Sequence, residues 1–289
     1  RVRELYYEIA YLDRATATLR DTRELLRGFR EVSESLYAVG DGLQADVLQA
    51  QIAVAETTGD LTLFEERRTA TLARLNALLG RGPQEDLGAV ELPPTGGPLP
   101  PTEELMARAA VARPALAAAR ERIRAAEAAR RGADLNAKPD ISLMAAYGHR
   151  SGFADLASIS VGVSLPLFSG SKQQPMRRES EAVLRLREAQ ELELLNETFA
   201  RLTELRAAAD RALELERLYG TSILPQARAA VAAALSEYQV GRVDFMTLLN
   251  MQMTVNRFEI ERLRLSADNH IAVAGIEAFL DGRLEETAP

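Results

Sequence analysis

The feature of this sequence that most limits its fold is an internal repeat with an offset of 201 residues. The identities are Tyr37/Tyr238, Val39/Val240, Gly40/Gly241, Leu48/Leu249 and Gln51/Gln252. The same register extends, without a gap, as far as the pair Leu79/Leu280. Solenoid repeats recur every ~20–50 residues, so this much longer period indicates a duplicated half-domain. Each half is therefore expected to have a related function within one symmetric structure.

Composition favours long helices and excludes several functional classes. Ala, Leu, Glu and Arg dominate, 47% of residues are hydrophobic, and only 5% are aromatic. The net charge of −7 argues against a nucleic-acid surface, which needs clustered Lys and Arg. Cysteine is absent, which excludes a disulfide framework, a thiolate metal site and a cysteine nucleophile. No apolar run approaches the ~20 residues of a membrane-spanning helix.

The first copy of the repeat reads as a helical hairpin over residues 1–80. Helical periodicity extends to about residue 36, Gly40-Asp41-Gly42 interrupts it, and a second helix continues to Leu79. Residues 81–101 follow as a linker rich in proline and glycine, without helix potential.

The rest of the chain continues the helical pattern around one different segment. Residues 102–137 are expected to form helices that pause at Arg113-Pro114, and residues 171–282 form the second helical hairpin. Its first helix is interrupted near Gly220 and kinked or broken at Pro225. Residues 283–289 are left as a C-terminal tail.

Residues 138–170 break the helical period and predict a β-hairpin. Apolar residues alternate in 141–148 and, more cleanly, in 159–165, where one face is aliphatic and the other is Ser and Gly. About ten loop residues join the two runs. Such a strand pair fits either a sheet covered by helices or a membrane β-barrel with aliphatic residues toward lipid. The barrel is favoured because the helices are too long to cover a short hairpin, and because Tyr147, Phe153 and Phe168 lie near strand ends.

The order and spacing of several motifs resemble the TolC-like outer-membrane efflux proteins, the channels of tripartite efflux or type I secretion systems. The matching segments are Tyr37-x-x-Gly40 with 46–51, Tyr238-x-x-Gly241 with 248–252, 113–117, 138–143 and 161–168. The resemblance covers almost the whole chain. It implies a mostly helical fold with one β-hairpin, in which long antiparallel helical hairpins form a trimeric α-barrel tunnel.

The resemblance also implies partners and a location. A homotrimer would share one β-barrel in the outer membrane, in contact with its lipid, while the helices project into the periplasm. A periplasmic adaptor and an inner-membrane pump would deliver small molecules or ions for export, without nucleic acid. Shifting 141–168 by the repeat offset of 201 places the partner hairpin at −60 to −33. An N-terminally truncated chain is therefore expected.

The two Tyr-x-x-Gly turns fall at the periplasmic tips, where the family meets its adaptor and its gate. The expected contact residues are Tyr37, Gly40, Asp41, Tyr238, Gly241, Arg242 and Asp244. The candidate gate residues are Asp46, Thr247 and Asn250. Some family members carry acids at the positions of Thr247 and Asn250, so an acidic gate would depend on Asp46. The plainer explanations are that both glycines end helices and that Asp41 and Asp244 cap them.

Nothing in the sequence predicts an enzyme, a cofactor or a metal site. His149 and His270 are the only histidines, and neither belongs to a metal-binding spacing. Met246, Met251 and Met253 could bind a soft metal ion, but methionines at helical spacing are usually packing residues. The alternatives to a channel are a periplasmic coiled-coil adaptor and a soluble helical scaffold. An adaptor usually carries several small β-rich domains, and this chain predicts only one hairpin.

Overall fold

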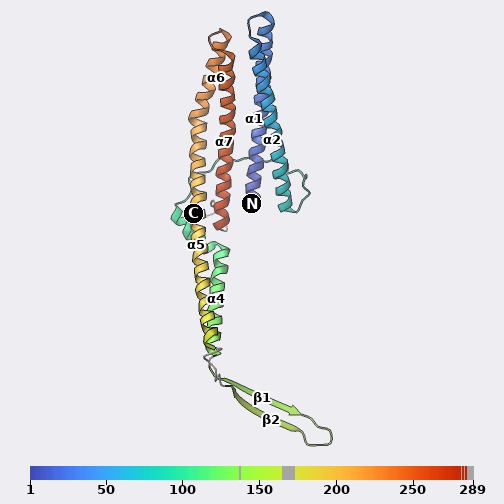
Figure 1. Ribbon diagram of the computed structural model, residues 1–289, viewed down its shortest axis with the longest axis vertical. Coiled ribbons are helices and arrows are strands. Elements are labelled where there is room, and N and C mark those ends of the chain that lie inside the picture. Colours follow the sequence, from blue (N-terminus) through green and yellow to red (C-terminus); the bar gives the residue numbers. More distant parts are fainter. Residues whose placement is uncertain (137, 165–172, 281, 283, 285–289) are drawn as a thin grey trace. The chain divides into compact units, whose positions relative to one another are not determined.

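The computed structural model describes residues 1–289 apart from 137, 165–172, 281, 283 and 285–289 (Figure 1). Phe168 and most of the predicted tail 283–289 therefore lie outside the described residues. The chain divides into two units. The first comprises Arg1–Thr102, Leu202–Ala278 and Gly282–Pro289, and the second comprises Glu103–Arg201 and Phe279–Asp281.

The first unit begins with the predicted helical hairpin. Helix α1 is Val2–Val39 and helix α2 is Gln44–Leu79. Each ends at a glycine in the left-handed region, Gly40 with φ 85° and Gly80 with φ 68°. Glycine adopts this conformation without the strain that a Cβ would add, which is why both helices end there.

The second hairpin uses an interrupted first arm. Helix α5 (Gln173–Leu218) leads into a π-helical turn, η1 (Tyr219–Ile223), and then into helix α6 (Leu224–Gln239). Helix α7 (Phe245–Leu280) returns alongside α6 (Figure 1). The predicted interruption near Gly220 and Pro225 is confirmed, and it takes the form of a π turn rather than a break.

The core of the first unit forms where α7 packs against α1 and α2. Near the tips, Leu26, Ala50, Ala53, Phe245 and Leu249 are all buried in one cluster. A second cluster farther along unites Tyr11, Leu12 and Ala15 with Ala267. A buried hydrogen bond of 2.9 Å from Thr22 to Asn256 lies between these clusters. The two copies of the repeat therefore share a continuous, mostly apolar contact.

The Pro/Gly-rich linker binds the helices of this unit together. Asn76, fully buried in α2, donates to the carbonyl oxygens of Glu85 (2.8 Å) and Pro83 (3.4 Å). Leu92 then packs against the Tyr11 cluster, and the Pro93 carbonyl lies 2.9 Å from His270 Nε2 on α7. The linker thus crosses from α2 over α1 to α7, although it has no helix or strand of its own.

The second unit contains helices α3 (Thr102–Ala112) and α4 (Pro114–Leu135) and the predicted β-hairpin. Strand β1 (Asp140–Gly148) pairs antiparallel with β2 (Leu156–Ser164), and Leu143 lies opposite Val161. Every strand residue is exposed, so the aliphatic face has no cover within the described chain. The loop is shorter than predicted, because β2 begins at Leu156 rather than at Ile159. Among the described helices, none is both long and apolar enough to cross a membrane.

Candidate functional site at the helical tips

The two predicted tip turns have the same backbone geometry. Gly40 has φ 85° and Gly241 has φ 70°. The Gly40 N–H donates to the Tyr37 carbonyl at 3.1 Å, and the Gly241 N–H donates to the Tyr238 carbonyl at 3.0 Å. In both copies the amide of the next residue donates to the carbonyl oxygen just before that of the tyrosine. Asp41 donates to Leu36 (3.0 Å), and Arg242 donates to Glu237 (2.9 Å). The repeat therefore preserves a helix-ending turn as well as its sequence.

The helices that leave the two turns begin with opposite halves of a capping box. Leu43 precedes α2 without a capping side chain, but Asp46 stands at the third helical position, where the backbone of Leu43 lowers the pKa of its carboxyl. In the second copy the acid stands before the helix instead. Asp244 accepts from the Thr247 N–H and from the Thr247 hydroxyl, each at 2.8 Å. Since Asp46 and Thr247 are equivalent repeat positions, each copy keeps one acidic arm of the motif.

These contacts show which of the two candidate aspartates, Asp41 and Asp244, caps a helix. Asp244 does cap α7, as the plainer explanation required. Asp41 contributes its backbone N–H to the turn, as the donor of a hydrogen bond to the Leu36 carbonyl oxygen. Asp41 and Arg242 are both exposed, at equivalent positions of the two turns.

The two tyrosines of the repeat lie in different environments. Tyr37 is 49% exposed. Tyr238 instead packs against the buried cluster near the tips, with its ring centroid 5.7 Å from that of Phe245. Ser33 of α1 also lies near the Tyr238 hydroxyl and lowers its pKa, although burial raises that pKa more. Tyr238 thus joins the second tip to the first hairpin, a difference that the repeat does not reveal.

Charges at the tips are coupled across the two hairpins. Burial raises the pKa of the Asp46 carboxyl above its ordinary value, and the nearby Asp244 raises it further. The pKa of the Tyr238 hydroxyl is also raised, first by burial and then by Asp46. By contrast, the hydrogen bonds from Thr247 lower the pKa of Asp244. Asp46, Tyr238 and Asp244 are therefore electrostatic neighbours, although Asp46 lies almost 200 residues from the other two in the sequence.

The remaining gate candidate, Asn250, is exposed on α7, and Thr247 is half-buried. Among the methionines considered above, Met253 packs against the apolar cluster near the tips, as a packing residue would. Within the described residues, no group of three or more His, Asp or Glu side chains could hold a metal ion.

Sequence reasoning missed two residues of the tips. A Cβ on Gly42 would lie 2.9 Å from both the Leu36 Cβ and the Tyr37 nitrogen, so this position requires glycine for space. Ser33 is almost fully buried, donates to the Phe29 carbonyl at 2.9 Å, and lies near Tyr238. The sequence Gly40-Asp41-Gly42 was a signal for the first residue. A serine inside a helix gives no comparable signal for the second.

Comparison with solved structures defines the class of fold. The outer-membrane protein VceC of Vibrio cholerae has a TM-score of 0.85 and 21% identity, covering 98% of this chain and 69% of VceC. The channel OprN has a TM-score of 0.86 and 20% identity, with 98% and 66% coverage. The open MtrE channel of Neisseria gonorrhoeae has a TM-score of 0.82 and 17% identity, with 98% and 65% coverage. The fold is that of TolC-like channels, long antiparallel helical hairpins with a β-hairpin, and the chain spans about two thirds of their length.

The chain belongs to the outer membrane efflux protein family, since that family's model matches residues 105–282, more than half of the sequence. No match was found among curated protein sequences. The family consists of transport channels rather than enzymes, which agrees with the prediction made from the sequence. The match to a TolC-like family is confirmed as well.

Proposed function

We propose that this chain belongs to a homotrimeric channel that exports small molecules or ions across the outer membrane. Family membership supports the channel, and the duplicated tip carries the proposal, because both hairpins end in turns of the same geometry. Three chains with two such tips each would place six similar turns around one axis. An axial ring of this kind is a natural place for a gate and for contact with a periplasmic adaptor.

In the proposed arrangement the β-hairpin faces outer-membrane lipid and the helices project into the periplasm. The aliphatic side chains of one hairpin face are all exposed, including Leu143, Ile159 and Val161. Their alternation with Ser and Gly on the other face suits lipid on one side and water on the other. An inner-membrane pump and its adaptor would supply the energy, since the channel itself carries out no chemical step.

Gating is assigned to the tips, with Asp46 as the charged gate residue. Asp46 is half-buried beside Asp244 and Tyr238, whereas its repeat equivalent is the uncharged Thr247. Threefold repetition would turn Asp46 into a ring of negative charge, which favours cations at a constriction. The exposed residues Tyr37, Gly40, Asp41, Gly241 and Arg242 are assigned to adaptor contact at the same end.

The first experiment is the native mass of the protein from the intact gene, purified in mild detergent from the outer-membrane fraction. A trimer in that fraction supports the channel. A monomer or dimer in the soluble fraction would contradict it and favour the helical scaffold. Co-purification with an inner-membrane pump in detergent, without recovery in the outer-membrane fraction, would favour the adaptor.

The second experiment tests the gate by single-channel recording in planar bilayers. Asp46→Asn should reduce the preference for cations over anions, because it removes the proposed ring of charge. Asp41→Asn is the matched control, since it removes a carboxyl from the neighbouring turn at an exposed position. Equal effects of both substitutions would mean that surface charge at the tips, and not a constriction at Asp46, sets the selectivity.

A further inference from the structure

The π turn η1 interrupts the first arm of the second hairpin, where α5 ends and α6 begins. The amide of Leu224 donates to the carbonyl of Tyr219, five residues back, instead of four. Pro225 follows at once, and it has no amide hydrogen to continue the α-helical pattern. Helix α5 and helix α6 are therefore joined by wider and weaker helical geometry. Such turns are a common place for helices to bend.

Arg262 of α7 lies directly against this turn. A Cβ on Gly220 would be 3.1 Å from its guanidinium carbon, so glycine leaves the space that the guanidinium occupies. The same guanidinium binds Glu216 of α5 at 2.8 Å. Tyr219 meets Phe258 of α7 edge to face, with 5.6 Å between ring centroids. The turn is therefore held by side chains from α7 rather than by its own backbone alone.

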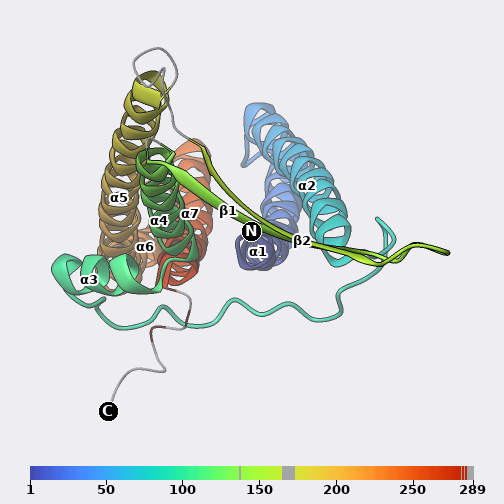
Figure 2. The ribbon, with the colours of Figure 1, turned by 90° about the horizontal axis from the view of Figure 1, so that it is seen from below.

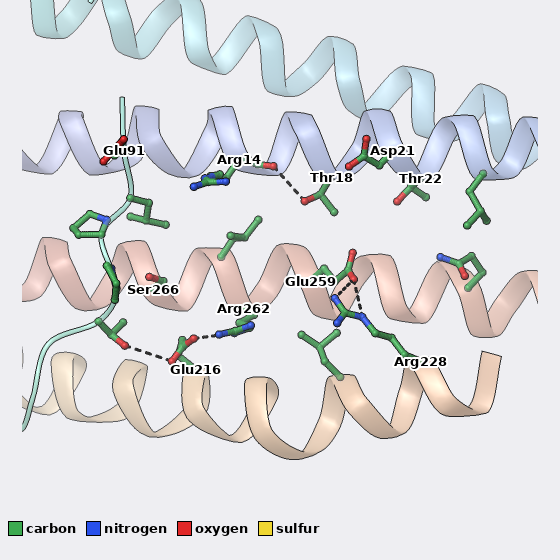
Figure 3. Close-up of a pocket in the computed structure, with 18 residues that line it drawn as sticks. Arg14, Thr18, Asp21, Thr22, Glu91, Glu216, Arg228, Glu259, Arg262 and Ser266 are labelled. Atoms are coloured by element: carbon green, nitrogen blue, oxygen red, sulfur yellow. Dashed lines mark hydrogen bonds and ion pairs between the residues drawn. The ribbon is translucent and has the colours of Figure 1, made fainter. Parts of the chain in front are cut away.

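The ion pairs beside the turn divide between its two sides, as Figure 3 shows. Glu216–Arg262 joins α5 to α7 on the side away from the tip. Arg228–Glu259, at 2.6 Å, joins α6 to α7 on the tip side. Only 14% of the Glu216 side chain is exposed, so its charge is poorly solvated and depends on Arg262. The Arg228 side chain is 61% exposed, and its pair is correspondingly weaker.

Space for movement exists next to the turn. A cavity of about 1150 Å³ lies between α1, the linker and the α5–α7 hairpin, and Glu216, Leu224 and Arg262 line it. Close-packed helices resist displacement, because their side chains interdigitate. An open cavity on one side of a π turn removes this resistance in one direction.

We propose that η1 is a hinge between α5 and α6. The contacts of Arg262 with Glu216 and with the turn hold this hinge in the observed position. Movement at this hinge would displace the second tip while α5 stays in place. The role of that movement in opening the channel rests on the proposed function, but the hinge itself does not.

Distances between spin labels test the hinge in the full-length protein in detergent. Residues 1–289 contain no cysteine, so labels can be placed at two chosen sites within them. Ala207→Cys and Ala233→Cys provide exposed sites on α5 and α6, on opposite sides of the turn. Arg262→Gln should shift or broaden the distance distribution by on the order of 3 Å, two residues of helical rise. Gly220→Ala should change the distribution less, because its Cβ requires the Arg262 guanidinium to move by only a few tenths of an ångström.

Two matched variants and a reference pair complete the test. Arg228→Gln removes the ion pair on the tip side, and Gly59→Ala adds a methyl group at a helical glycine with open space around it. Both should leave the distribution unchanged, as should labels at Ala45 and Thr69, within the uninterrupted α2. The hinge is overturned if neither Arg262→Gln nor Gly220→Ala changes the distances, or if Arg228→Gln changes them equally.

Channel recordings on the same variants separate the hinge from the proposed function. Altered distances with altered open probability support both. Altered distances with unchanged currents, or in a protein that forms no channel, support the hinge and overturn its role in gating. Altered currents without altered distances overturn the hinge and leave gating at the tips intact.

Discussion

At the residue scale, two glycines of the first tip are required for different physical reasons. Gly40 has φ 85° and open space around it, so a side chain there would strain the backbone without touching a neighbour. Gly42 lies so close to the preceding helix that a Cβ would approach the backbone of Tyr37. A flexible side chain could move away from such a contact, but a backbone nitrogen in a helix cannot.

Gly42→Ala should therefore destabilise the first tip by about 1–3 kcal/mol, as overpacking does. Gly40→Ala should cost about 1–2 kcal/mol, the strain of a left-handed residue with a Cβ. Exchange rates of the Asp41 amide report on both, because this amide closes the turn. Gly59→Ala in α2 is the control and should be stabilising by up to about 1 kcal/mol. Exchange at Asp41 that is as slow in Gly42→Ala as in the native protein would refute the steric argument.

The pH dependence of the tips should have opposite signs in the two copies. Asp244 has a lowered pKa, so its capping bonds stabilise the fold above the ordinary value of 3.8 and are lost as the pH falls through the folded pKa. Asp46 has a raised pKa, so its contribution is largest at low pH and is lost as the pH rises through its folded pKa. NMR titration of the aspartate carboxyl carbons should give midpoints on opposite sides of 3.8. Midpoints on the same side would be inconsistent with burial of Asp46 or with the capping bonds of Asp244.

At the scale of elements, the linker shows how a segment without regular structure is held in place. One buried side chain of α2, Asn76, satisfies the carbonyl oxygens of Pro83 and Glu85. Leu87 and Val90 then cover the buried residues Ile9 and Leu75. The prediction of an extended linker from its prolines and glycines described the backbone, but not these anchors.

Asn76→Ala should cost about 1–3 kcal/mol, because it leaves two carbonyl oxygens without their donor and a gap at a fully buried site. The linker should also become a faster target for limited proteolysis. Asn250→Ala removes an exposed asparagine of α7 and should stay within about 0.5 kcal/mol of the native protein. Equal proteolysis of both variants would show that the apolar contacts alone hold the linker.

The β-hairpin shows where hydrophobic periodicity fails to predict the end of a strand. The prediction that Ile159, Val161 and Val163 share one face of a strand is confirmed, because strong alternation of large and small residues specifies the faces. The start of β2 at Leu156 was missed, since Leu156-Ala157-Ser158 alternates only weakly. There the pairing with Gly148, Tyr147 and Ala146 extends the strand instead.

At the scale of the whole molecule, the exposed hairpin face should decide whether the chain reaches its membrane. Leu143→Lys places a charge on the aliphatic face, which costs roughly 2–4 kcal/mol in a lipid-facing strand at the bilayer midplane. Ser160→Lys places the same charge on the opposite face, where water is expected. Leu143→Lys should reduce the trimer recovered from the outer-membrane fraction, and Ser160→Lys should not. Equal recovery of both variants would contradict a lipid-facing hairpin.

The amino-acid sequence was sufficient to predict the duplication, the approximate ends of the helices, the β-hairpin and the family. All of these depend on residues close together in the chain, on a period, or on copies at a constant offset. Only the packing of the helices places Tyr238 near Ser33, makes Asp46 and Asp244 neighbours, and fills the space beside Gly220 with Arg262. The Tyr238 and Asp46 contacts join segments about 200 residues apart, and the Arg262 contact joins α7 to the π turn. They depend on how whole helices pack, which local propensities do not specify.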